Sequence, residues 1–134
     1  MMKKLLLIAV TCFVSKFCFA IDPFIVKTYV KGSFAIASNN KLSSIIVSDN
    51  EFTGVKRVAK DLQIDLQKVT DIKPEILIDK PAKLAIIIGT IGNSKVIDEL
   101  IASNKINVAG VAGKWESTLI EVVKKPFPGV DSAL

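Results

Sequence analysis

Carboxylates are the side chains of this sequence with the most chemistry to offer, since it contains 13 acidic residues and no histidine. Two positioned carboxyl groups can hydrolyse a glycosidic bond as acid and base without any histidine. Asp61 and Asp65 share one face of a predicted helix, but neighbouring lysines indicate an ordinary solvated surface. Glu116 and Glu121 lie an odd number of positions apart on a predicted strand, so their side chains point to opposite faces. Because neither pair forms an acid–base couple, the sequence predicts no catalytic residue in this chain.

Histidine and cysteine chemistry is excluded by composition. Without histidine, the chain lacks the general base of the Ser-His and Cys-His nucleophile pairs and a ligand of most zinc sites. Its two cysteines, Cys12 and Cys18, lie in an amino-terminal segment that we expect to be removed. The sequence therefore predicts no disulfide, no thiol nucleophile, no metal site and no cofactor.

A turn of small residues, Gly89-Thr90-Ile91-Gly92, connects a predicted buried strand to a predicted helix. Free backbone amides at the start of a helix attract anions, so a phosphate-binding loop is one interpretation. The turn lacks the Lys-Ser/Thr pair of a nucleotide P-loop and one glycine of the dinucleotide fingerprint. We therefore favour a structural interpretation, in which a tight strand-to-helix turn requires small residues.

The second candidate site is the segment Lys114-Trp115-Glu116, which holds the single tryptophan of the chain. An indole face can stack on a sugar ring, while Lys114 and Glu116 can hydrogen-bond hydroxyl groups or a carboxylate. These three residues are the predicted substrate-binding residues. The structural alternative, which we favour, is that Trp115 fills the core or an interface between domains at the start of a strand.

The first twenty residues have the layout of a secretory signal peptide. Lys3 and Lys4 precede an apolar run over residues 5–14, and cleavage is predicted after Ala20. The run has about half of the ~20 residues that a membrane-crossing helix needs, so an uncleaved anchor is disfavoured. Cleavage removes three lysines and lowers the net charge from +5 to +2. The predicted protein is therefore secreted or periplasmic, with neither a nucleic acid nor a membrane among its partners.

Apolar periodicity in the mature chain predicts strands that alternate with two main helices. Asp49 or Asn50 is expected to cap the first helix, which ends near Thr70-Asp71, and Lys31-Gly32 is expected to form a hairpin or a bulged turn. A mixed sheet with two helices defines the fold class α/β (α+β). The predicted strands cover residues 24–30, 33–37, 44–47, 75–78, 84–88 and 117–123, and the second helix covers 95–103.

Two of these elements carry distinct burial predictions. On the first helix, apolar residues recur at spacings of three, four and seven and predict one buried stripe. The strand over residues 84–88 is apolar throughout, as expected of a central strand covered on both faces. The stripe consists of Val55, Val58, Ala59, Leu62, Leu66 and Val69.

The mature chain, residues 21–134, is predicted to form one accessory domain, because its length fits a typical domain of roughly 100–150 residues. Residues 130–134 look like the approach to a further strand. Natural domains usually cover an unpaired apolar sheet edge. We therefore expect this domain to be the front of a longer protein.

Several segments of the mature chain form a recognisable set. Lys114–Ser117 followed by Pro126–Val130 is the most specific combination, and Ala59–Leu62 with Val69-Thr70 belongs to the same pattern. Together these segments resemble the amino-terminal region of family 115 glycoside hydrolases, which are secreted xylan α-glucuronidases. The remaining matching segments are Phe34–Ala37, Ile86–Ser94, Val96–Asp98 and Ile120–Val123.

The chain departs from this family pattern at two positions. Asp71 stands where the family tends to have glycine after Val-Thr, which bears on how the first helix ends. Thr118 stands where an aromatic residue is usual, which bears on any contact made there.

The resemblance implies an accessory α/β domain of an inverting enzyme that removes (4-O-methyl-)glucuronic acid from xylan without a redox cofactor. It also implies that the catalytic carboxylates lie in a downstream (β/α)₈ barrel. That barrel, together with glucuronoxylan, is the partner expected for this domain. Two alternatives remain open: a free-standing secreted carbohydrate- or anion-binding module, and a structural domain whose open sheet edge binds a partner strand.

Overall fold

The computed structural model describes residues 25–134, so the predicted signal peptide and Phe24 lie outside the described residues. The chain divides into two compact units, Met1–Val30 and Lys31–Leu134. In the first unit, residues 25–30 form bends and irregular chain, so the strand predicted over 24–30 is wrong for these residues. Alternating apolar residues are a weak signal by themselves, because a strand forms only where a neighbouring strand completes its hydrogen bonds. The fold described below is that of the second unit.

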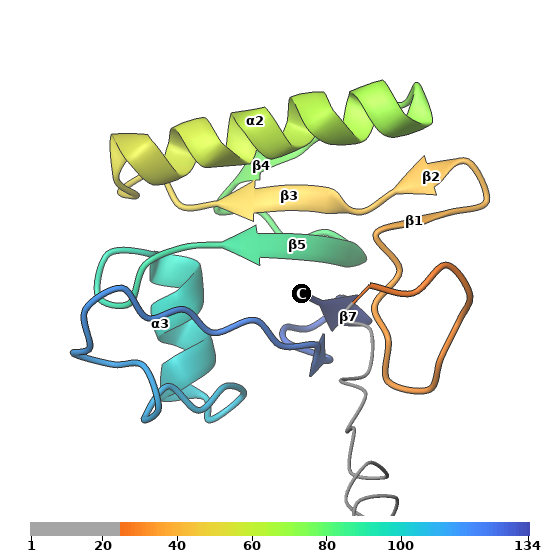
Figure 1. Ribbon diagram of the computed structural model, residues 1–134. Helices are drawn as coiled ribbons and strands as arrows, with labels where there is room; N and C mark the ends of the chain where they lie inside the picture. The colour runs from red at the N-terminus through yellow and green to blue at the C-terminus, as the bar shows by residue number, and fades with distance from the viewer. Residues whose placement is uncertain (1–24) are drawn as a thin grey trace, which may run out of the picture. The chain divides into compact units, whose positions relative to one another are not determined.

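A five-stranded mixed sheet forms the centre of the second unit, with the strand order β4-β3-β5-β7-β6. Strands β4, β3, β5 and β7 run parallel, and β6 pairs antiparallel with β7. Together with two helices, this sheet confirms the predicted α/β fold class (Figure 1). The strands are β3 (Ser44–Val47), β4 (Ile76–Ile78), β5 (Leu84–Ile88), β6 (Val123–Lys124) and β7 (Ser132–Ala133).

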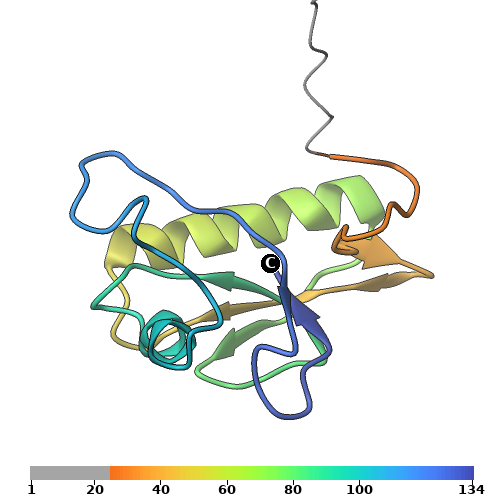
Figure 2. The same cartoon turned by 90° about the horizontal axis from the view of Figure 1, so that it is seen from below.

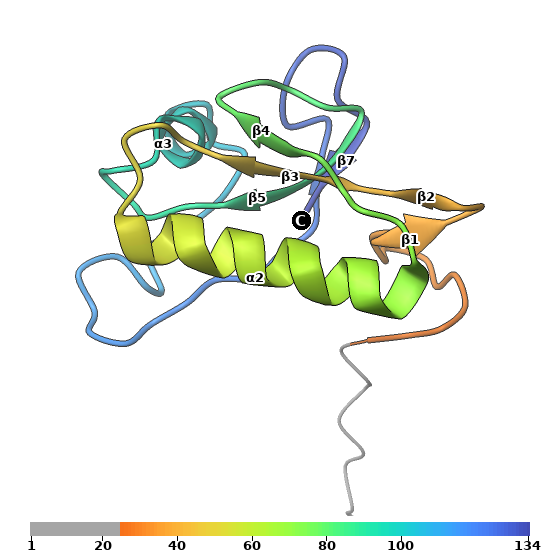
Figure 3. The ribbon, with the colours of Figure 1, turned by 90° about the horizontal axis from the view of Figure 1, so that it is seen from above.

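The two helices lie on opposite faces of this sheet (Figures 1 and 3). Helix α2 (Thr53–Thr70) packs over Ile45 and Val47 of β3, and its Ala59 completes that core cluster. Ile46 points to the other face, where it lies near Val96 of helix α3 (Lys95–Ala102). Ile46 is only 2% exposed, so β3 is buried on both faces.

Strand β5 and helix α3 agree closely with the sequence prediction. β5 lies in the middle of the sheet between β3 and β7, as its continuous apolar character indicated. Ala85 is fully buried and Ile86 is 7% exposed. Helix α3 begins and ends within one residue of the predicted range, and Ser94 caps its amino terminus.

The predicted apolar stripe of α2 is only partly confirmed. Leu62 and Leu66 pack against the core beside the buried Ala59, but Val58 and Val69 are 58% and 84% exposed. A helix of 18 residues is about 27 Å long, whereas a strand of four residues is about 13 Å long. The sheet is therefore too short to cover the whole stripe, and Val69 lies near the uncovered end of the helix.

Both ends of α2 differ from the simplest expectation. Its N-cap residue is Phe52, which makes no side-chain capping bond, so the predicted cap at Asp49 or Asn50 is wrong. Asp49 instead belongs to the turn before the helix, where its backbone carbonyl accepts a hydrogen bond from Lys56 Nζ. At the other end, Asp71 adopts a φ of 58°, the left-handed conformation that glycine usually takes after a helix. Asp71 therefore has the backbone conformation typical of glycine, although its side chain makes that conformation less favourable.

A short hairpin precedes β3 at a position different from the predicted one. Strands β1 (Ala37–Ser38) and β2 (Lys41–Leu42) pair antiparallel around Asn39-Asn40, whose φ angles are 50° and 56°. A two-residue hairpin of this type needs positive φ at both central positions, which asparagine tolerates. Residues 31–32 do form a turn, in which Gly32 has a φ of 95°, but the strand predicted over 33–37 is wrong except at Ala37, which belongs to β1, so no hairpin forms around Lys31-Gly32.

The carboxyl-terminal part of the chain departs most from prediction. The strand predicted over residues 117–123 is wrong except at its last residue, because only Val123 and Lys124 pair, as β6. Residues 130–134, predicted as the approach to a further strand, already contain one, because β7 pairs with β5 on one side and with β6 on the other. The earlier residues of the predicted strand have no neighbouring strand to pair with in the part of the chain that the structure describes.

A tight turn connects β6 to β7 (Figure 2). The Val130 N–H donates to the Phe127 carbonyl, and Gly129 between them has a φ of 79°. Proline followed by a glycine with positive φ is the usual composition of a type II turn, and Pro128 precedes Gly129 here.

Among residues 25–134, no helix has the length and apolar character needed to cross a membrane.

Candidate functional site

The carboxyl ends of β3 and β5 form the point where the direction of the connections in the sheet reverses. The chain leaves β3 through α2 to β4 on one side, and it leaves β5 through α3 toward β7 on the other. In open α/β sheets, ligands bind outside the carboxyl ends of the strands at such a point. We refer to residues 48–51 and 89–94, which follow the two strands, as the switch-point site.

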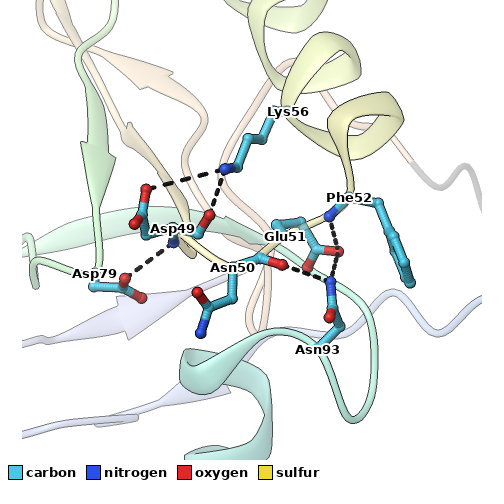
Figure 4. A network of polar contacts seen from close by, with 7 residues as sticks. All are labelled: Asp49, Asn50, Glu51, Phe52, Lys56, Asp79 and Asn93. Atoms are coloured by element: carbon cyan, nitrogen blue, oxygen red, sulfur yellow. Dashed lines mark hydrogen bonds and ion pairs between the residues drawn. The ribbon is translucent and has the colours of Figure 1, made fainter.

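Glu51 is the central residue of the switch-point site. Its side chain lies among backbone and amide donors from both strand ends, and the residue is only 4% exposed (Figure 4). Its Oε2 accepts from the Thr90 N–H at 2.8 Å, and its Oε1 accepts from the Phe52 N–H at 3.0 Å. Asn93 Nδ2 donates to Oε1 at 3.4 Å and to the Asn50 carbonyl at 2.8 Å. Glu51 thereby joins the turn after β5 to the start of α2.

These contacts determine the protonation of Glu51. Burial by itself raises the pKa of this carboxyl group, because the charged form loses hydration. Hydrogen bonds from the Phe52 and Thr90 backbones and from the Thr90 and Asn93 side chains outweigh that effect and lower the pKa below its ordinary value of 4.5. Glu51 is therefore a fixed anion at neutral pH.

Two further carboxylates bind backbone amides at the same edge of the sheet. Asp79, which follows β4, accepts from the Asp49 N–H at 3.0 Å, and this bond lowers the pKa of Asp79 below its ordinary value of 3.8. Asp98, in the first turn of α3, accepts from the Gly92 N–H at 2.8 Å. Carboxylates of the protein itself thus accept hydrogen bonds from backbone amides in both loops of the site, residues 48–51 and 89–94.

This arrangement argues against an anion-binding role for the turn over residues 89–94. A phosphate or carboxylate ligand would bind the amides that point out of the strand ends. The Thr90 and Gly92 amides already donate to Glu51 and Asp98. An external anion would have to displace a carboxylate of the protein and would meet its negative charge. The geometry therefore favours the structural interpretation of this turn.

Close packing beneath the turn explains its small residues. Ser48 and Ser94 are both fully buried, and their hydroxyl oxygens lie 3.0 Å apart in a hydrogen bond. Ser94 Oγ also accepts from the Ile97 N–H, which caps α3. A Cβ atom at Gly89 would lie 2.4 Å from Ser94 Oγ and 2.8 Å from an Ile97 side-chain carbon. Only glycine fits at position 89 without moving the helix cap.

The predicted substrate-binding residues Lys114, Trp115 and Glu116 lie on an exposed loop. Trp115 is 90% exposed, so its predicted role as a core residue is wrong, while a role at an interface stays a prediction. Lys114 Nζ folds back to donate to the Gly110 carbonyl at 2.7 Å. Glu116 has a positive φ of 50°. The three residues are neighbours in sequence, but no hollow among residues 25–134 that we identify is lined by any of them.

The carboxylates considered for catalysis are surface residues. Asp61 lies 3.9 Å from Arg57 and Asp65 lies 3.4 Å from Lys68, each measured from a carboxylate oxygen to a side-chain nitrogen of the basic residue. Such exposed helix pairs contribute a few tenths of a kcal/mol, roughly 0.3–0.5. Their geometry is that of solvated ion pairs. Within residues 25–134, no three acidic, histidine or cysteine side chains gather as a metal-binding group.

Two shallow hollows flank the turn between β6 and β7. The larger, of about 390 Å³, extends from Lys105 to residues 125–131. The smaller, of about 220 Å³, lies between Phe127-Pro128, the start of α3 and the loop after β4. Its charged residues are Asp79, Lys80 and Glu99. Neither hollow contains the amides of the switch-point site or any predicted site residue.

Glu51 is the site residue that sequence reasoning missed. Its signal was its position, since an acidic residue directly after a buried strand and before a helix lies at the carboxyl edge of the sheet. The partner amide of Thr90 is 39 positions away, so only the fold brings the two together.

The comparisons with known proteins add no relative to this description. No protein-family model matches the chain, and no curated protein is significantly similar to it.

Proposed function

We propose that this chain is the amino-terminal accessory domain of a secreted glycoside hydrolase. The enzyme would remove (4-O-methyl-)glucuronic acid from xylan by inverting hydrolysis, with its catalytic carboxylates in a separate (β/α)₈ barrel. The proposal begins from the segments that resemble family 115 glycoside hydrolases, above all Lys114–Ser117 and Pro126–Val130. In this role the domain itself carries no catalytic residue.

The observation that carries the proposal is the occupied switch-point site. A catalytic or nucleotide-binding α/β domain uses the amides at the carboxyl ends of its strands to bind substrate or cofactor. Here the side chains of Glu51, Asp79 and Asp98 occupy such amides, at 2.8, 3.0 and 2.8 Å. A domain with this edge closed is suited to packing against another domain rather than to chemistry of its own.

The exposed apolar side chains of the loop around Trp115 also support the role of an accessory domain. A tryptophan that is 90% exposed leaves a large apolar surface in water, which is unfavourable unless a ligand or another protein surface covers it. Leu119 and Ile120, which follow it, are 42% and 60% exposed. Contact with a neighbouring domain would bury all three side chains.

The experiment that tests this proposal compares the purified mature chain with the native product. Residues 21–134 are expected to release no glucuronic acid from glucuronoxylan. A native protein recognised by antibodies against this domain should have a larger intact mass, and α-glucuronidase activity should fractionate with it. A native product of 114 residues, or glucuronic acid release by the isolated chain, would contradict the proposal.

A second candidate function is a free-standing carbohydrate-binding module, and the exposure of Trp115 is the observation that favours it. An exposed indole next to Lys114 and Glu116 suits stacking on a sugar ring with hydrogen bonds at its edge. Titration of residues 21–134 with glucuronoxylan tests this alternative. Affinity that is lost in Trp115→Ala and retained in Phe52→Ala, a change at another exposed aromatic residue, would establish it.

A further inference from the structure

The larger hollow beside the turn between β6 and β7 is lined by two lysines whose charges are not paired. Lys105, which follows α3, and Lys125, directly after β6, both belong to its lining. Neither ammonium group makes an ion pair or a hydrogen bond with any of residues 25–134. The acidic residue of the lining is Asp131, whose Oδ2 lies 3.6 Å from Lys83 Nζ. Because Lys83 compensates that carboxylate, the hollow has an excess of positive charge.

The same hollow offers backbone donors in addition to the two lysines. Phe127 and Gly129 belong to its lining, and their N–H groups donate to no group of the described residues. This is the reverse of the switch-point site, where carboxylates of the protein accept from the loop amides. An anion that enters the hollow would therefore find donors without having to displace a side chain of the protein.

Lys125 has a backbone conformation that the turn alone does not explain. Seven described residues other than glycine have a positive φ, and five of them are asparagine or aspartate, which tolerate it best. Lys125, with a φ of 48°, and Glu116 are the other two. Glycine or asparagine would suit position 125 better on stability alone. Sparsely populated conformations of this kind concentrate at binding sites, and a ligand for the ammonium group would account for a lysine here.

The apolar part of the lining indicates which kind of anion suits the hollow. Pro126, Phe127 and Pro128 all belong to it, and Phe127 is only half-buried, so part of its side chain can contact a ligand. The volume of about 390 Å³ lies in the range of sites for small molecules, roughly 300–1,000 Å³. An inorganic anion would use the charges alone. An acidic sugar would also place its C–H groups against the aromatic ring.

The smaller hollow continues this surface on the other side of the turn. Phe127 and Pro128 line both hollows, and the turn lies on the same face of the sheet as α3, opposite to α2 (Figures 2 and 3). Glu99 of α3 lines the smaller hollow, and its carboxylate makes no hydrogen bond within the described structure. A carboxylate of this kind can accept from sugar hydroxyl groups. The other charged residues of this lining are Asp79 and Lys80.

We propose that the two hollows together form a binding site for an oligosaccharide that carries a carboxylate. Lys105 and Lys125 bind the carboxylate of the acidic sugar, and the ring of Phe127 packs against that sugar. Glu99 accepts hydrogen bonds from hydroxyl groups of the adjoining neutral sugar. The choice of a sugar acid rests on the proposed function, under which the substrate is xylan that bears glucuronic acid. The site binds the polysaccharide and takes no part in the reaction.

The test is calorimetric titration of the purified protein at neutral pH with two ligands that differ in one group. The first is xylotriose that carries one glucuronic acid, and the second is xylotriose alone. We expect the acidic ligand to bind about tenfold more tightly, as two solvent-accessible ion pairs would give. This advantage should decrease as salt is added, because the ammonium groups remain accessible to ions. Equal affinities for the two ligands would overturn the proposal.

Three lysine variants separate a defined site from attraction by net charge. Lys105→Gln and Lys125→Gln should each weaken binding of the acidic ligand about threefold. Neither should change the affinity for xylotriose alone. The matched control is Lys60→Gln, which removes the same charge from an exposed lysine of α2, on the opposite face of the sheet. An equal loss of affinity in Lys60→Gln would refute the site.

Two further variants test the rest of the lining. Phe127→Leu keeps an apolar side chain in the half-buried position but removes the aromatic ring, and thermal unfolding checks that it folds. It should weaken binding of both ligands, whereas Glu99→Gln should weaken binding of both by a smaller factor. Inorganic phosphate that competes as well as the acidic ligand would overturn the assignment to a sugar. Binding that is lost in Trp115→Ala and retained in Lys105→Gln would overturn it in favour of the exposed loop.

A third ligand distinguishes failure of this inference from failure of the proposed function. Oligogalacturonide carries sugar carboxylates but no xylose. If it binds, the lysine variants weaken that binding, and the glucuronic acid ligand does not bind, the site stands and the proposed substrate is refuted. If α-glucuronidase activity fractionates with a larger native product but neither acidic ligand binds, the site alone is refuted.

Discussion

The switch-point site and the exposed loop over residues 112–121 differ in the burial and hydrogen bonding of their side chains and backbone. At the switch-point site, Glu51 is 4% exposed and accepts hydrogen bonds from two backbone amides and one side-chain amide. On the loop, Trp115 is 90% exposed, and the backbone of residues 118–122 makes no hydrogen bond within the described structure. The polar groups of the switch-point site bind one another, whereas the loop has exposed side chains and backbone groups that a partner could contact.

This difference indicates which part of the domain is available to bind a partner. In an α/β domain the carboxyl edge of the sheet is the usual place for a ligand. Here that edge is stabilised by the protein's own carboxylates, while a loop far along the chain presents the unpaired groups. Four substitutions test the comparison, in order of the expected effect on stability.

Gly89→Ala should have the largest effect, because it tests how tightly the switch-point site is packed. The new Cβ atom would lie 2.4 Å from Ser94 Oγ, within the hydrogen-bonded pair of buried serines. We expect a loss of about 1–3 kcal/mol in the free energy of unfolding, as is usual for an overpacked position. Urea denaturation measures this loss.

Gly54→Ala is the matched control for that substitution. Gly54 lies in α2 with open space around its Cβ position, so alanine should stabilise the protein by about 0.4–1 kcal/mol. Equal effects of the two substitutions would contradict the close packing at Gly89.

Glu51→Gln should have the second largest effect, because it removes the internal anion. Glutamine retains one acceptor oxygen but places an NH₂ group against the donors at Thr90, Phe52 or Asn93. Leaving a buried donor without an acceptor costs about 1–3 kcal/mol. Glu75→Gln, a change of the same kind at an exposed position, should alter the unfolding free energy by less than about 0.5 kcal/mol.

The pH dependence of this pair gives a second measurement. Since the pKa of folded Glu51 is lowered below 4.5, its contribution is fully present above pH 4.5 and is lost as the pH falls through the lowered value. The stability difference between wild type and Glu51→Gln should therefore shrink below pH 4.5. A constant difference across that range would show that the charge of Glu51 does not stabilise the fold.

Asp71→Gly tests a smaller feature, the left-handed end of α2. Glycine adopts the φ of 58° seen here without steric cost, so we expect stabilisation of about 1 kcal/mol. Asp71→Ala retains the steric cost of a Cβ atom at positive φ and lacks the short polar side chain that makes this conformation easier for aspartate, so it should not stabilise the protein. Thermal unfolding of both variants measures the difference. A Gly variant no more stable than the Ala variant would contradict a left-handed residue at this position.

Trp115→Ala should have the smallest effect on stability, because its side chain is almost wholly in water. We expect a change within about 0.5 kcal/mol, and wild-type tryptophan fluorescence should have the emission of a solvent-exposed indole. Leu100→Ala, at a residue that is 2% exposed, is the control and should cost about 2–5 kcal/mol. A large loss of stability in Trp115→Ala would show that the loop is packed rather than available to a partner.

The sequence predicted the elements whose signals are local and strong. The apolar run over residues 84–88 identified the central strand β5, and the spacing of Val96, Ile97, Leu100 and Ile101 identified α3. The sequence was less informative for residues 24–30 and 117–123, whose strand composition led to a strand only at Val123 among the described residues.

The candidate site shows the same division. The small residues of the turn over residues 89–94 were recognised from sequence, and the structural interpretation of that turn fits the close approach of Ser94 to Gly89. The role of Glu51 was not recognised, because its partners Thr90 and Asn93 are about 40 positions away. The exposure of Trp115 was also not predicted, since tryptophan is buried on average and a core or interface role was favoured for it.

By itself, the sequence determined the α/β class, the central strand and the two helices, because apolar periodicity and chain-breaking residues act over a few neighbouring positions. Only the tertiary structure decided which strand-like segments become strands and which carboxylates bind amides. A strand needs a neighbour to complete its backbone hydrogen bonds, and a buried carboxylate needs donors that the fold brings from distant positions. Residues 118–122 have no neighbouring strand within the described structure, so they form none. Glu51 does have its donors, because the fold brings the Thr90 N–H to its carboxylate.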